Sequence, residues 1–166
     1  MVPAGSLKYR NYSLKKYLDE LASRSPVPGG GSAAAVAGAL GAALIAMAAR
    51  YSLGKGKSKA VEAQIKSIIG KSEKIRRRLL LLVELDAKAY LGLVKARKKN
   101  RQAKEKARRK ARETPLEICR LCYQAIALTP FLTKKGNPHL LSDVKAAIEL
   151  LFSAFNAAMI NVEINH

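Results

Sequence analysis

The chain has 166 residues, of which 49% are hydrophobic and 5% aromatic, and its formal net charge is +19. That length is sufficient for one domain with a sizeable core, and abundant Ala and Leu with no Pro between Gly31 and Thr114 exclude a typical β-sandwich or barrel. The charge predicts an anionic partner or substrate without identifying its class. We therefore expect an all-α fold, and a single domain over residues 1–166.

The first predicted helix runs from Leu14 to about Ser23, with Ser13 as its N-cap. Its apolar side chains recur at helical spacing and form one stripe, made of Leu14, Tyr17, Leu18 and Leu21. Pro26 and Pro28 then end the helix. The residues before it, "MVPAGSLKYRNYS", carry charges where a secretory signal needs an apolar core, so no signal is expected.

A glycine-rich turn precedes the second predicted helix, which runs from near Ser32 to about Tyr51. Glycines at a helix start leave backbone N–H groups free at the positive end of the helix dipole, which predicts a site for an anion or a carbonyl group. A flexible turn between packed helices is the alternative. The uncharged run from Ser32 to Ala49 is long enough for a membrane span, but it is mostly Ala and Gly. We predict instead a central helix packed on all sides.

The third predicted helix is long and amphipathic, with one seam whose positions alternate between spacings of four and three. The seam consists of Val61, Ile65, Ile68, Ser72, Ile75, Leu79, Leu82, Asp86, Ala89 and Leu93. Ser72 is expected to bond its own backbone, but a carboxylate at Asp86 is costly to bury unless it is paired or protonated. Two hypotheses follow for Asp86: a salt bridge, or a general acid/base tuned by burial.

A basic run follows from Lys95 to Arg112, with eleven Lys and Arg against one Glu. It predicts either a solvated face or non-specific phosphate contacts with a nucleic acid. Thr114–Glu117 reads as a capping box with Pro in the first turn, which predicts a fourth helix starting there and reaching about Leu128. Cys119 and Cys122 lack a second pair for zinc and are expected to be small buried side chains, as in a reducing cytoplasm.

The last predicted elements are a loop, "TKKGNPHLLSD", and a final helix capped by Ser142, with Asp143 in its first turn. Its buried face is expected to contain Val144, Ile148, Leu151, Phe155, Met159 and Val162. Near the end, "NVEIN" places Asn161 and Asn165 four residues apart, able to share one helix face. The alternative for this pair is surface solvation or helix termination.

Four stretches in this order, "PGGGSAAAVAGALGAALIAM", "LDAKAY", "KKGNPHLLSDV" and "NVEIN", resemble the cyclodeaminase/methenyltetrahydrofolate cyclohydrolase family, from Ser13 to Asn165. The resemblance implies a helical bundle with a central Ala/Gly-rich helix, usually dimeric, acting on a tetrahydrofolate without a metal or other cofactor. It places the acidic catalytic position on Asp86. The substrate-binding positions that it implies are Gly29, Gly30, Gly31, Ser32, Gly136, Asn137, Ser142, Asp143, Asn161 and Asn165.

The activity implied by the resemblance is hydrolysis of 5,10-methenyltetrahydrofolate to 10-formyltetrahydrofolate, with Asp86 as general acid/base. The alternative within the family is a formiminotetrahydrofolate cyclodeaminase that releases ammonia. An alternative of another class is a non-catalytic basic helical protein that binds nucleic acid or folate. The expected partners are a folate substrate, with polyglutamylated forms attracted by the basic run, and a second copy of the chain. No membrane and no specific nucleic acid are expected, and the expected compartment is the cytoplasm.

Overall fold

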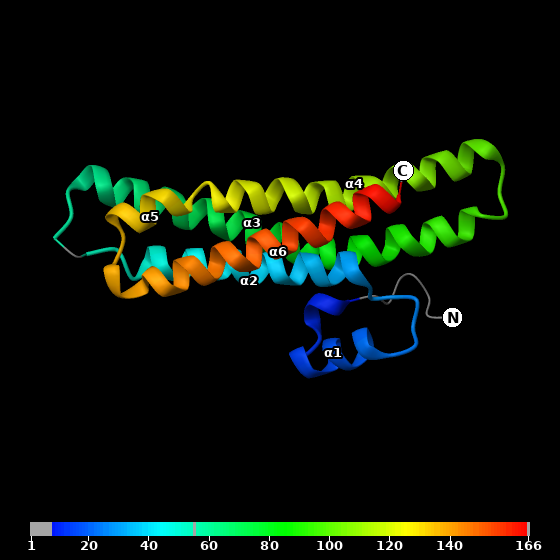
Figure 1. Ribbon diagram of the computed structural model, residues 1–166, viewed down its shortest axis with the longest axis horizontal. Helices are drawn as coiled ribbons and strands as arrows, with labels where there is room; N and C mark the ends of the chain where they lie inside the picture. Colours follow the sequence, from blue (N-terminus) through cyan, green and yellow to red (C-terminus); the bar gives the residue numbers. More distant parts are fainter. Residues whose placement is uncertain (1–7, 55, 166) are drawn as a thin grey trace.

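The structure is a computed structural model that describes residues 8–54 and 56–165. Within these residues it contains helices and no strand, so the predicted all-α class is confirmed (Figure 1). The helices are η1 (Tyr9–Asn11), α1 (Leu14–Ala22), α2 (Gly30–Arg50), α3 (Lys59–Ala96), α4 (Arg101–Ile126), α5 (Thr129–Lys135), η2 (Pro138–Leu140) and α6 (Leu141–Ile164). The expected lack of a secretory signal concerns mainly residues 1–7, which lie outside the described residues.

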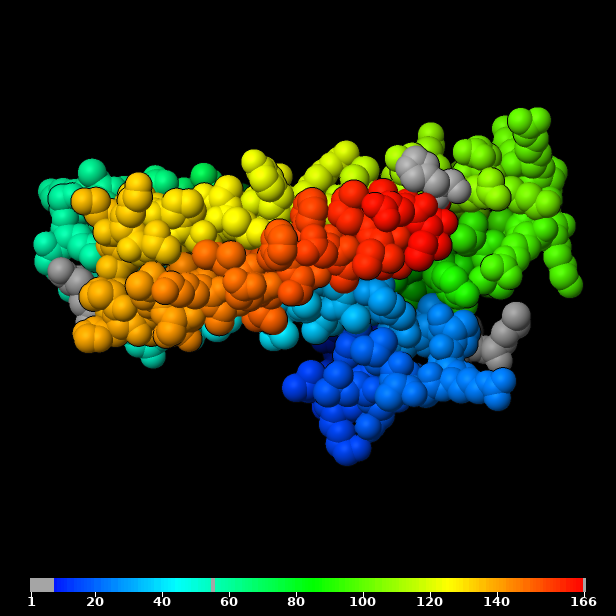
Figure 2. Space-filling view, in the orientation of Figure 1, coloured from blue at the N-terminus to red at the C-terminus, as the bar shows by residue number. Residues whose placement is uncertain are grey.

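Helices α2, α3, α4 and α6 lie side by side along the long axis and form the bundle (Figure 1). α2 packs against the other three, whereas α1 and η1 lie to one side, near the N-terminal end of α2 (Figure 1). The hairpin formed by α3 and α4 extends beyond the others at one end. In Figure 2 its tip and the α1 region are the parts that project from the elongated body. The N-terminal end of α2 therefore lies where α1, the hairpin and the end of α6 meet.

The seam predicted for the third helix is confirmed as the buried face of α3. Its members from Ile65 to Leu82 are all buried, and Asp86, Ala89 and Leu93 are partly buried where the hairpin begins to leave the bundle. The Ser72 hydroxyl donates to the Ile68 carbonyl at 2.8 Å, as expected for a polar residue on this seam. Cys119 and Cys122 are buried free thiols, and burial raises the pKa of Cys122 to about 12.

The small residues of α2 allow its neighbours to approach closely. A Cβ at Gly38 would lie 3.0 Å from Cys122 Sγ, and one at Gly41 would lie 2.6 Å from Leu151 Cγ. Both α2 and the segment Pro138–Ile164 are long and apolar enough to cross a membrane, and 61% of the apolar window of α2 is buried in the bundle. The prediction that α2 is packed on all sides is wrong for a single chain. An uncharged stripe stays partly exposed, made of Ala33, Ala37, Leu40, Leu44 and Met47.

The predicted start of the fourth helix is wrong. α4 begins at Arg101, and its N-cap is Asn100, whose side chain accepts a hydrogen bond from the Ala103 backbone N–H at 3.0 Å. Thr114 is therefore inside the helix, and its hydroxyl donates to the Lys110 carbonyl rather than capping. Pro115, expected in a first turn, lies in the helix interior. Burial against α3 and α6 holds the helix continuous through a residue that would end an isolated one.

The boundaries around the last helix also differ from the prediction. α5 occupies Thr129–Lys135, part of which was predicted as loop, and η2 leads directly into α6. Because these turns are continuous, Asn137 is the cap: its side chain accepts from the His139 N–H at 3.1 Å. Ser142 therefore lies inside α6 and does not cap it, whereas Asp143 is in the first turn as expected.

Candidate active site

A cavity of about 270 Å³ opens at the N-terminal end of α2. Its walls come from the segment before α2, from the second half of α3, from the middle of α4 and from the end of α6. The residues that line it are Pro26, Val27, Gly29, Gly30, Asp86, Ala89, Tyr90, Ala111, Asn161, Ile164 and Asn165. The cavity thus brings together five of the residues singled out in the sequence, from three stretches far apart in the chain.

Asp86 packs directly on the backbone at the start of α2. A Cβ added at Gly31 would overlap the Asp86 carboxyl group, with Cγ at 2.6 Å and Oδ2 at 2.8 Å. Gly31 lies at the second position of α2, where backbone N–H groups have no partner within the helix. The carboxylate therefore sits at the positive end of a 21-residue helix, and glycine is the residue that leaves room for it.

The environment of Asp86 makes it more basic than an ordinary carboxylate. Burial raises the pKa of Asp86 from its usual 3.8 to about 6, and a hydrogen bond from the Ser32 backbone N–H opposes this rise. No salt bridge to Asp86 occurs among the described residues. Of the two hypotheses for this residue, the geometry favours the acid/base group over the ion pair.

Behind Asp86, a buried hydroxyl pair connects α1 to α2. The Tyr17 and Ser32 hydroxyl oxygens are 2.9 Å apart, and both residues are buried. Burial raises the pKa of Tyr17, the bond to Ser32 opposes that effect, and the nearby charge of Asp86 adds to the rise. Tyr17 does not line the cavity, so its role is to hold α1 against the start of α2.

We expect Tyr17→Phe to lower the free energy of unfolding by about 1–3 kcal/mol, because the buried Ser32 hydroxyl loses its partner. Turnover should fall by less than about tenfold, since no group that lines the cavity is removed. Urea unfolding and steady-state rates on the same preparation test both statements. Tyr12→Phe is the matched control, because Tyr12 packs edge-on to Tyr9 and its hydroxyl has no hydrogen bond among the described residues. Equal effects of the two variants would contradict this assignment.

The two amides of "NVEIN" form one wall of the cavity. The Asn161 side-chain NH₂ donates to the Ala157 carbonyl at 2.8 Å, and that of Asn165 donates to the Ala111 carbonyl at 3.1 Å. A Cβ at Gly30 would lie 3.7 Å from Asn161 Nδ2, so this wall faces the glycine turn. With their NH₂ groups held in this way, both side chains keep a carbonyl oxygen available as an acceptor.

The Gly136–Asp143 stretch lies at the opposite end of α2. The Asn137 N–H donates to Ser52 Oγ at 2.8 Å, and its side chain contacts the Tyr51 carbonyl, just beyond the last turn of α2. Because α2 has 21 residues, about 30 Å separates this point from Gly30. Within one chain, Gly136, Asn137, Ser142 and Asp143 therefore do not reach the Asp86 cavity.

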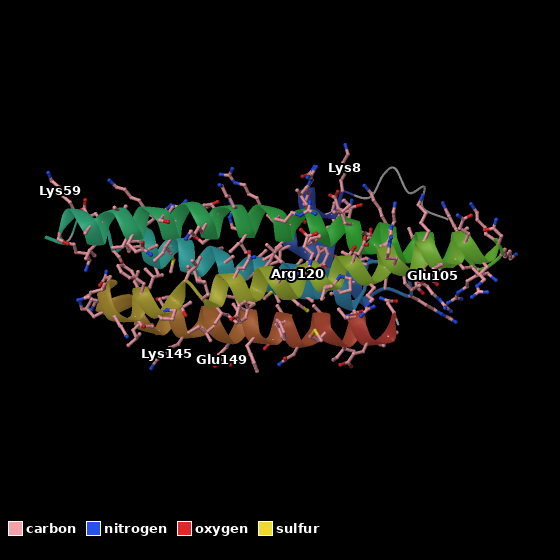
Figure 3. The ribbon with its side chains drawn as sticks, turned by 90° about the horizontal axis from the view of Figure 1, so that it is seen from above. Lys8, Lys59, Glu105, Arg120, Lys145 and Glu149 are labelled. Atoms are coloured by element: carbon pink, nitrogen blue, oxygen red, sulfur yellow. The ribbon has the colours of Figure 1, made fainter. Side chains whose placement is uncertain are left out.

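A second cavity, of about 360 Å³, adjoins the first and is strongly basic. Ile164 and Asn165 line both. The other side of the second cavity comes from the α3–α4 hairpin, whose contributing residues are Leu93, Ala96, Arg97, Lys104 and Arg108. Figure 3 shows the charged side chains of this hairpin spread around its tip, where Glu105 is labelled. An acidic ligand in the first cavity can thus extend toward three cations.

Three participants were not identified from the sequence. Tyr17 was interpreted only as part of an apolar stripe. Tyr90 was quoted within "LDAKAY" but given no role, although it is 41% exposed and lines the cavity. Ala111 was hidden inside the basic run, where the spacing of Ala103, Ala107 and Ala111 would have indicated an inner helix face. In the described part of the chain, no group of three or more His, Cys, Asp and Glu side chains gathers.

Comparison with known proteins connects this geometry to a family. Residues 13–166 match the family described as Formiminotransferase-cyclodeaminase. The chain is 36% identical to the methenyltetrahydrofolate cyclohydrolase of Methylorubrum extorquens, covering 93% of this chain and 79% of that protein. It is 30% identical to the formimidoyltransferase-cyclodeaminase of Rattus norvegicus, covering 92% of this chain and 30% of the rat protein.

A solved structure shows the same arrangement of helices. The formiminotetrahydrofolate cyclodeaminase of Thermotoga maritima superposes with a TM-score of 0.90 at 31% identity, covering 93% of this chain and 78% of that one. The resemblance predicted from four short stretches is therefore confirmed over nearly the whole chain. The chain belongs to the formiminotransferase-cyclodeaminase family.

Proposed function

We propose that the protein hydrolyses 5,10-methenyltetrahydrofolate to 10-formyltetrahydrofolate, with Asp86 as the general acid/base. The observation that carries this proposal is the Asp86 carboxyl group, which lines a cavity, has a pKa raised to about 6 and forms no salt bridge with any of the residues that the structure describes. At neutral pH it is mostly ionised, yet it holds a proton better than an ordinary carboxylate. The name of the bacterial relative at 36% identity supports the same reaction.

The chemistry requires one group that both attracts a cation and moves a proton. The methenyl carbon is bonded to two nitrogens that share a positive charge, and the Asp86 anion stabilises that charge. As water adds to this carbon, Asp86 accepts one of its protons. The proton then passes to the folate nitrogen whose bond to the carbon breaks, and the remaining hydroxyl proton leaves to solvent as the formyl C=O forms. The net products are 10-formyltetrahydrofolate and one proton.

The cyclodeaminase reaction is the second candidate, and the similarity to the T. maritima structure and to the rat protein favours it. One assay separates the two activities: loss of methenyltetrahydrofolate absorbance marks the hydrolase, and ammonia release from 5-formiminotetrahydrofolate marks the deaminase. We expect hydrolysis of methenyltetrahydrofolate to be the faster of the two reactions. An absence of acceleration with both substrates would reject the proposed function. These enzyme names also favour catalysis over the nucleic-acid-binding alternative.

We further propose that the reaction uses no cofactor besides its folate substrate, and that it takes place in the cytoplasm. The catalytic steps above need one carboxylate and water. The two buried free thiols support a reducing compartment.

The adjoining basic cavity supports a preference for folates with a glutamate tail. Arg97, Lys104 and Arg108 face it, and it meets the Asp86 cavity at Ile164 and Asn165. A substrate whose ring lies beside Asp86 can therefore place its tail carboxylates among these cations. The same charges attract any polyanion at long range, so an affinity for nucleic acid that vanishes at physiological salt is compatible with this proposal.

We expect Arg108→Ala to raise KM for a pentaglutamate substrate by about tenfold, the value of one charge-assisted hydrogen bond. KM for the monoglutamate should change far less, and kcat should stay constant because Asp86 is untouched. Lys74→Ala is the control, since Lys74 is an exposed cation in the middle of α3 and lines neither cavity. An equal effect on both substrates, or an equal effect of the control, would contradict this placement of the tail.

We also propose that two copies pair along the exposed stripe of α2. The stripe is uncharged, its small residues permit close packing, and Leu40 at its centre is 53% exposed. Leu40 is also the midpoint of Gly30–Arg50, so a two-fold axis there would place two α2 helices antiparallel. The Gly136–Asp143 stretch of the second copy would then lie beside the Asp86 cavity of the first. This pairing accounts for predicted site residues that a single chain holds about 30 Å apart.

Subunit complementation tests this pairing. Asp86→Asn and Asp143→Ala should each inactivate the enzyme, but an equal mixture, unfolded and refolded together, should recover about a quarter of wild-type turnover, because half of the pairs are mixed and carry one intact site. Adding Leu40→Lys to both chains should abolish the recovery and give monomers by analytical ultracentrifugation. Tyr123→Lys is the control for an exposed side chain on α4. Failure to recover any activity from a mixture that does form mixed pairs would reject the shared site.

A further inference from the structure

Pro115 leaves one backbone carbonyl of α4 without its usual partner. In an α-helix the N–H of each residue donates to the carbonyl four residues earlier, and proline has no N–H. The carbonyl that Pro115 would serve is that of Ala111. Pro115 is buried in the interior of a 26-residue helix, far from either end, so the missing bond is not a consequence of fraying.

The Ala111 carbonyl is used instead by the candidate site. It accepts the Asn165 side-chain NH₂ at 3.1 Å, across 54 residues of sequence and from a different helix. Ala111 is 6% exposed and lines the Asp86 cavity, so the bond forms at the wall of that cavity. A buried carbonyl without a partner is costly, and Asn165 removes that cost.

The hydrogen bond from the Asn165 side chain to the Ala111 carbonyl, called the anchor below, determines which polar group Asn165 offers to a ligand. Because its NH₂ is held by Ala111, its Oδ1 remains as the available group, at the junction of the two cavities. Asn161 is oriented in the same sense by the Ala157 carbonyl. Together with the Asp86 carboxylate, this wall presents three acceptors, which suits the face of a heterocycle that carries N–H donors.

We propose that Pro115 is a positioning residue: it frees the Ala111 carbonyl, which orients Asn165 to accept a hydrogen bond from the folate ring system. The assignment of the ligand rests on the proposed function, whereas the anchor itself does not. Any other residue at this position restores an N–H that competes with Asn165 for the Ala111 carbonyl. Pro115 thus contributes to the site without touching the substrate.

The test uses two replacements that restore the N–H but differ in volume, Pro115→Ala and Pro115→Val. Both remove an unfavourable residue from a helix interior, so the melting temperature of at least one should equal or exceed that of wild type. KM for methenyltetrahydrofolate should nevertheless rise by about tenfold in both, the value of one hydrogen bond, while kcat stays within about twofold. Thr114→Ala is the control, since it removes the neighbouring bond to Lys110 and keeps the proline.

A double variant shows whether Pro115 acts through Asn165. Asn165→Ala should raise KM by a similar factor, and Pro115→Ala in that background should add nothing, because the group it positions is gone. Independent effects that multiply would overturn the proposal. So would a KM change that follows the volume of residue 115, or an unchanged KM in a folded variant.

A measurement without ligand separates this proposal from the proposed function. The side-chain NH₂ resonances of Asn165, assigned in the full-length wild-type protein, should shift in Pro115→Ala and not in Thr114→Ala. If the wild-type protein turns over neither folate substrate, the proposed function is wrong. The Asn165 resonances then still test whether Pro115 leaves the Ala111 carbonyl free for Asn165. Unchanged Asn165 resonances in Pro115→Ala would overturn it in either case.

Discussion

Asp86→Asn should give a protein that folds, melts at a higher temperature than wild type and turns over methenyltetrahydrofolate at least about 100-fold more slowly. Asparagine keeps the shape of the side chain next to Gly31 but neither accepts a proton nor carries the charge that faces the substrate cation. Folate binding should survive, because the other walls of the cavity are unchanged. Rates at saturating substrate and a dissociation constant on the same preparation separate these effects.

The stability gain should depend on pH in a defined direction. Burial raises the Asp86 pKa from 3.8 to about 6, so between these values the folded state holds a proton that the unfolded state has lost. Below pH 4, wild type and Asp86→Asn should therefore be equally stable. The difference should grow as pH rises from about 4 to about 6, because only the unfolded state has then lost its proton, and should stay at about 2–3 kcal/mol at higher pH. Denaturant melts at pH 4 and pH 8 measure it.

The rate of the wild type provides the second half of this test. kcat/KM should fall as pH drops below about 6, because the base becomes protonated. Asp19→Asn is the control: Asp19 is an exposed carboxylate paired with Lys15 on α1, and its loss should change neither the pH profile nor the rate. An Asp86→Asn variant that retains wild-type turnover would reject Asp86 as the acid/base. A variant that loses stability and activity together would instead support a structural role for Asp86.

Gly31→Ala should be nearly as damaging to turnover as the loss of the Asp86 carboxylate, about 100-fold. The added methyl group would overlap the carboxyl group of Asp86, so that side chain must leave the end of α2. We also expect a loss of about 1–3 kcal/mol in the free energy of unfolding, as for other overpacked sites. Steady-state rates and denaturant melts provide both values.

Gly70→Ala is the matched control for this substitution. Nothing lies within 4 Å of a Cβ added at Gly70, which is exposed inside α3, so that variant should be slightly more stable and fully active. The clash itself can be verified in an Asp86→Ala background, where Gly31→Ala should cost almost no further stability because the obstructing carboxyl group is gone. A full stability loss in that background would show that Gly31 matters for a different reason.

Local sequence signals predicted the parts of the fold that short-range physics determines. The N-cap at Ser13 and the seam of α3 were located correctly, because caps and helical spacing act within a few residues. The start of α4 was not, since proline favours a first turn locally whereas burial of Ala111, Pro115 and Ile118 decides the outcome in the bundle. The Ser142 cap was wrong for a similar reason: η2 extends the turn back to Asn137.

The same distinction between short-range signals and long-range contacts applies to the residues of the candidate site. Asp86 stood out from the sequence because a carboxylate interrupted an apolar seam, and the structure places it beside the glycine turn. Tyr17 could not be distinguished, because its ring satisfies the apolar pattern of α1 and its hydroxyl finds Ser32 only after folding. The Ala111 carbonyl is a backbone group, and no side-chain pattern reports which carbonyl a distant Asn will use.

Helix α2 restricts which insertions and deletions this sequence can accept during evolution. The first turn of α2 contacts Asp86 at Gly31. Just after the last turn, Ser52 accepts a hydrogen bond from Asn137 of the Gly136–Asp143 stretch. Inserting or deleting one residue between them would shift one end by about 1.5 Å and rotate it by about 100° relative to the other. A substitution that preserves the helix and adds no clash at its glycines keeps both contacts, whereas a single-residue indel breaks one of them. The segment from Gly31 to Ser52 is therefore constrained in its length as well as at the positions where its glycines and serines make contacts.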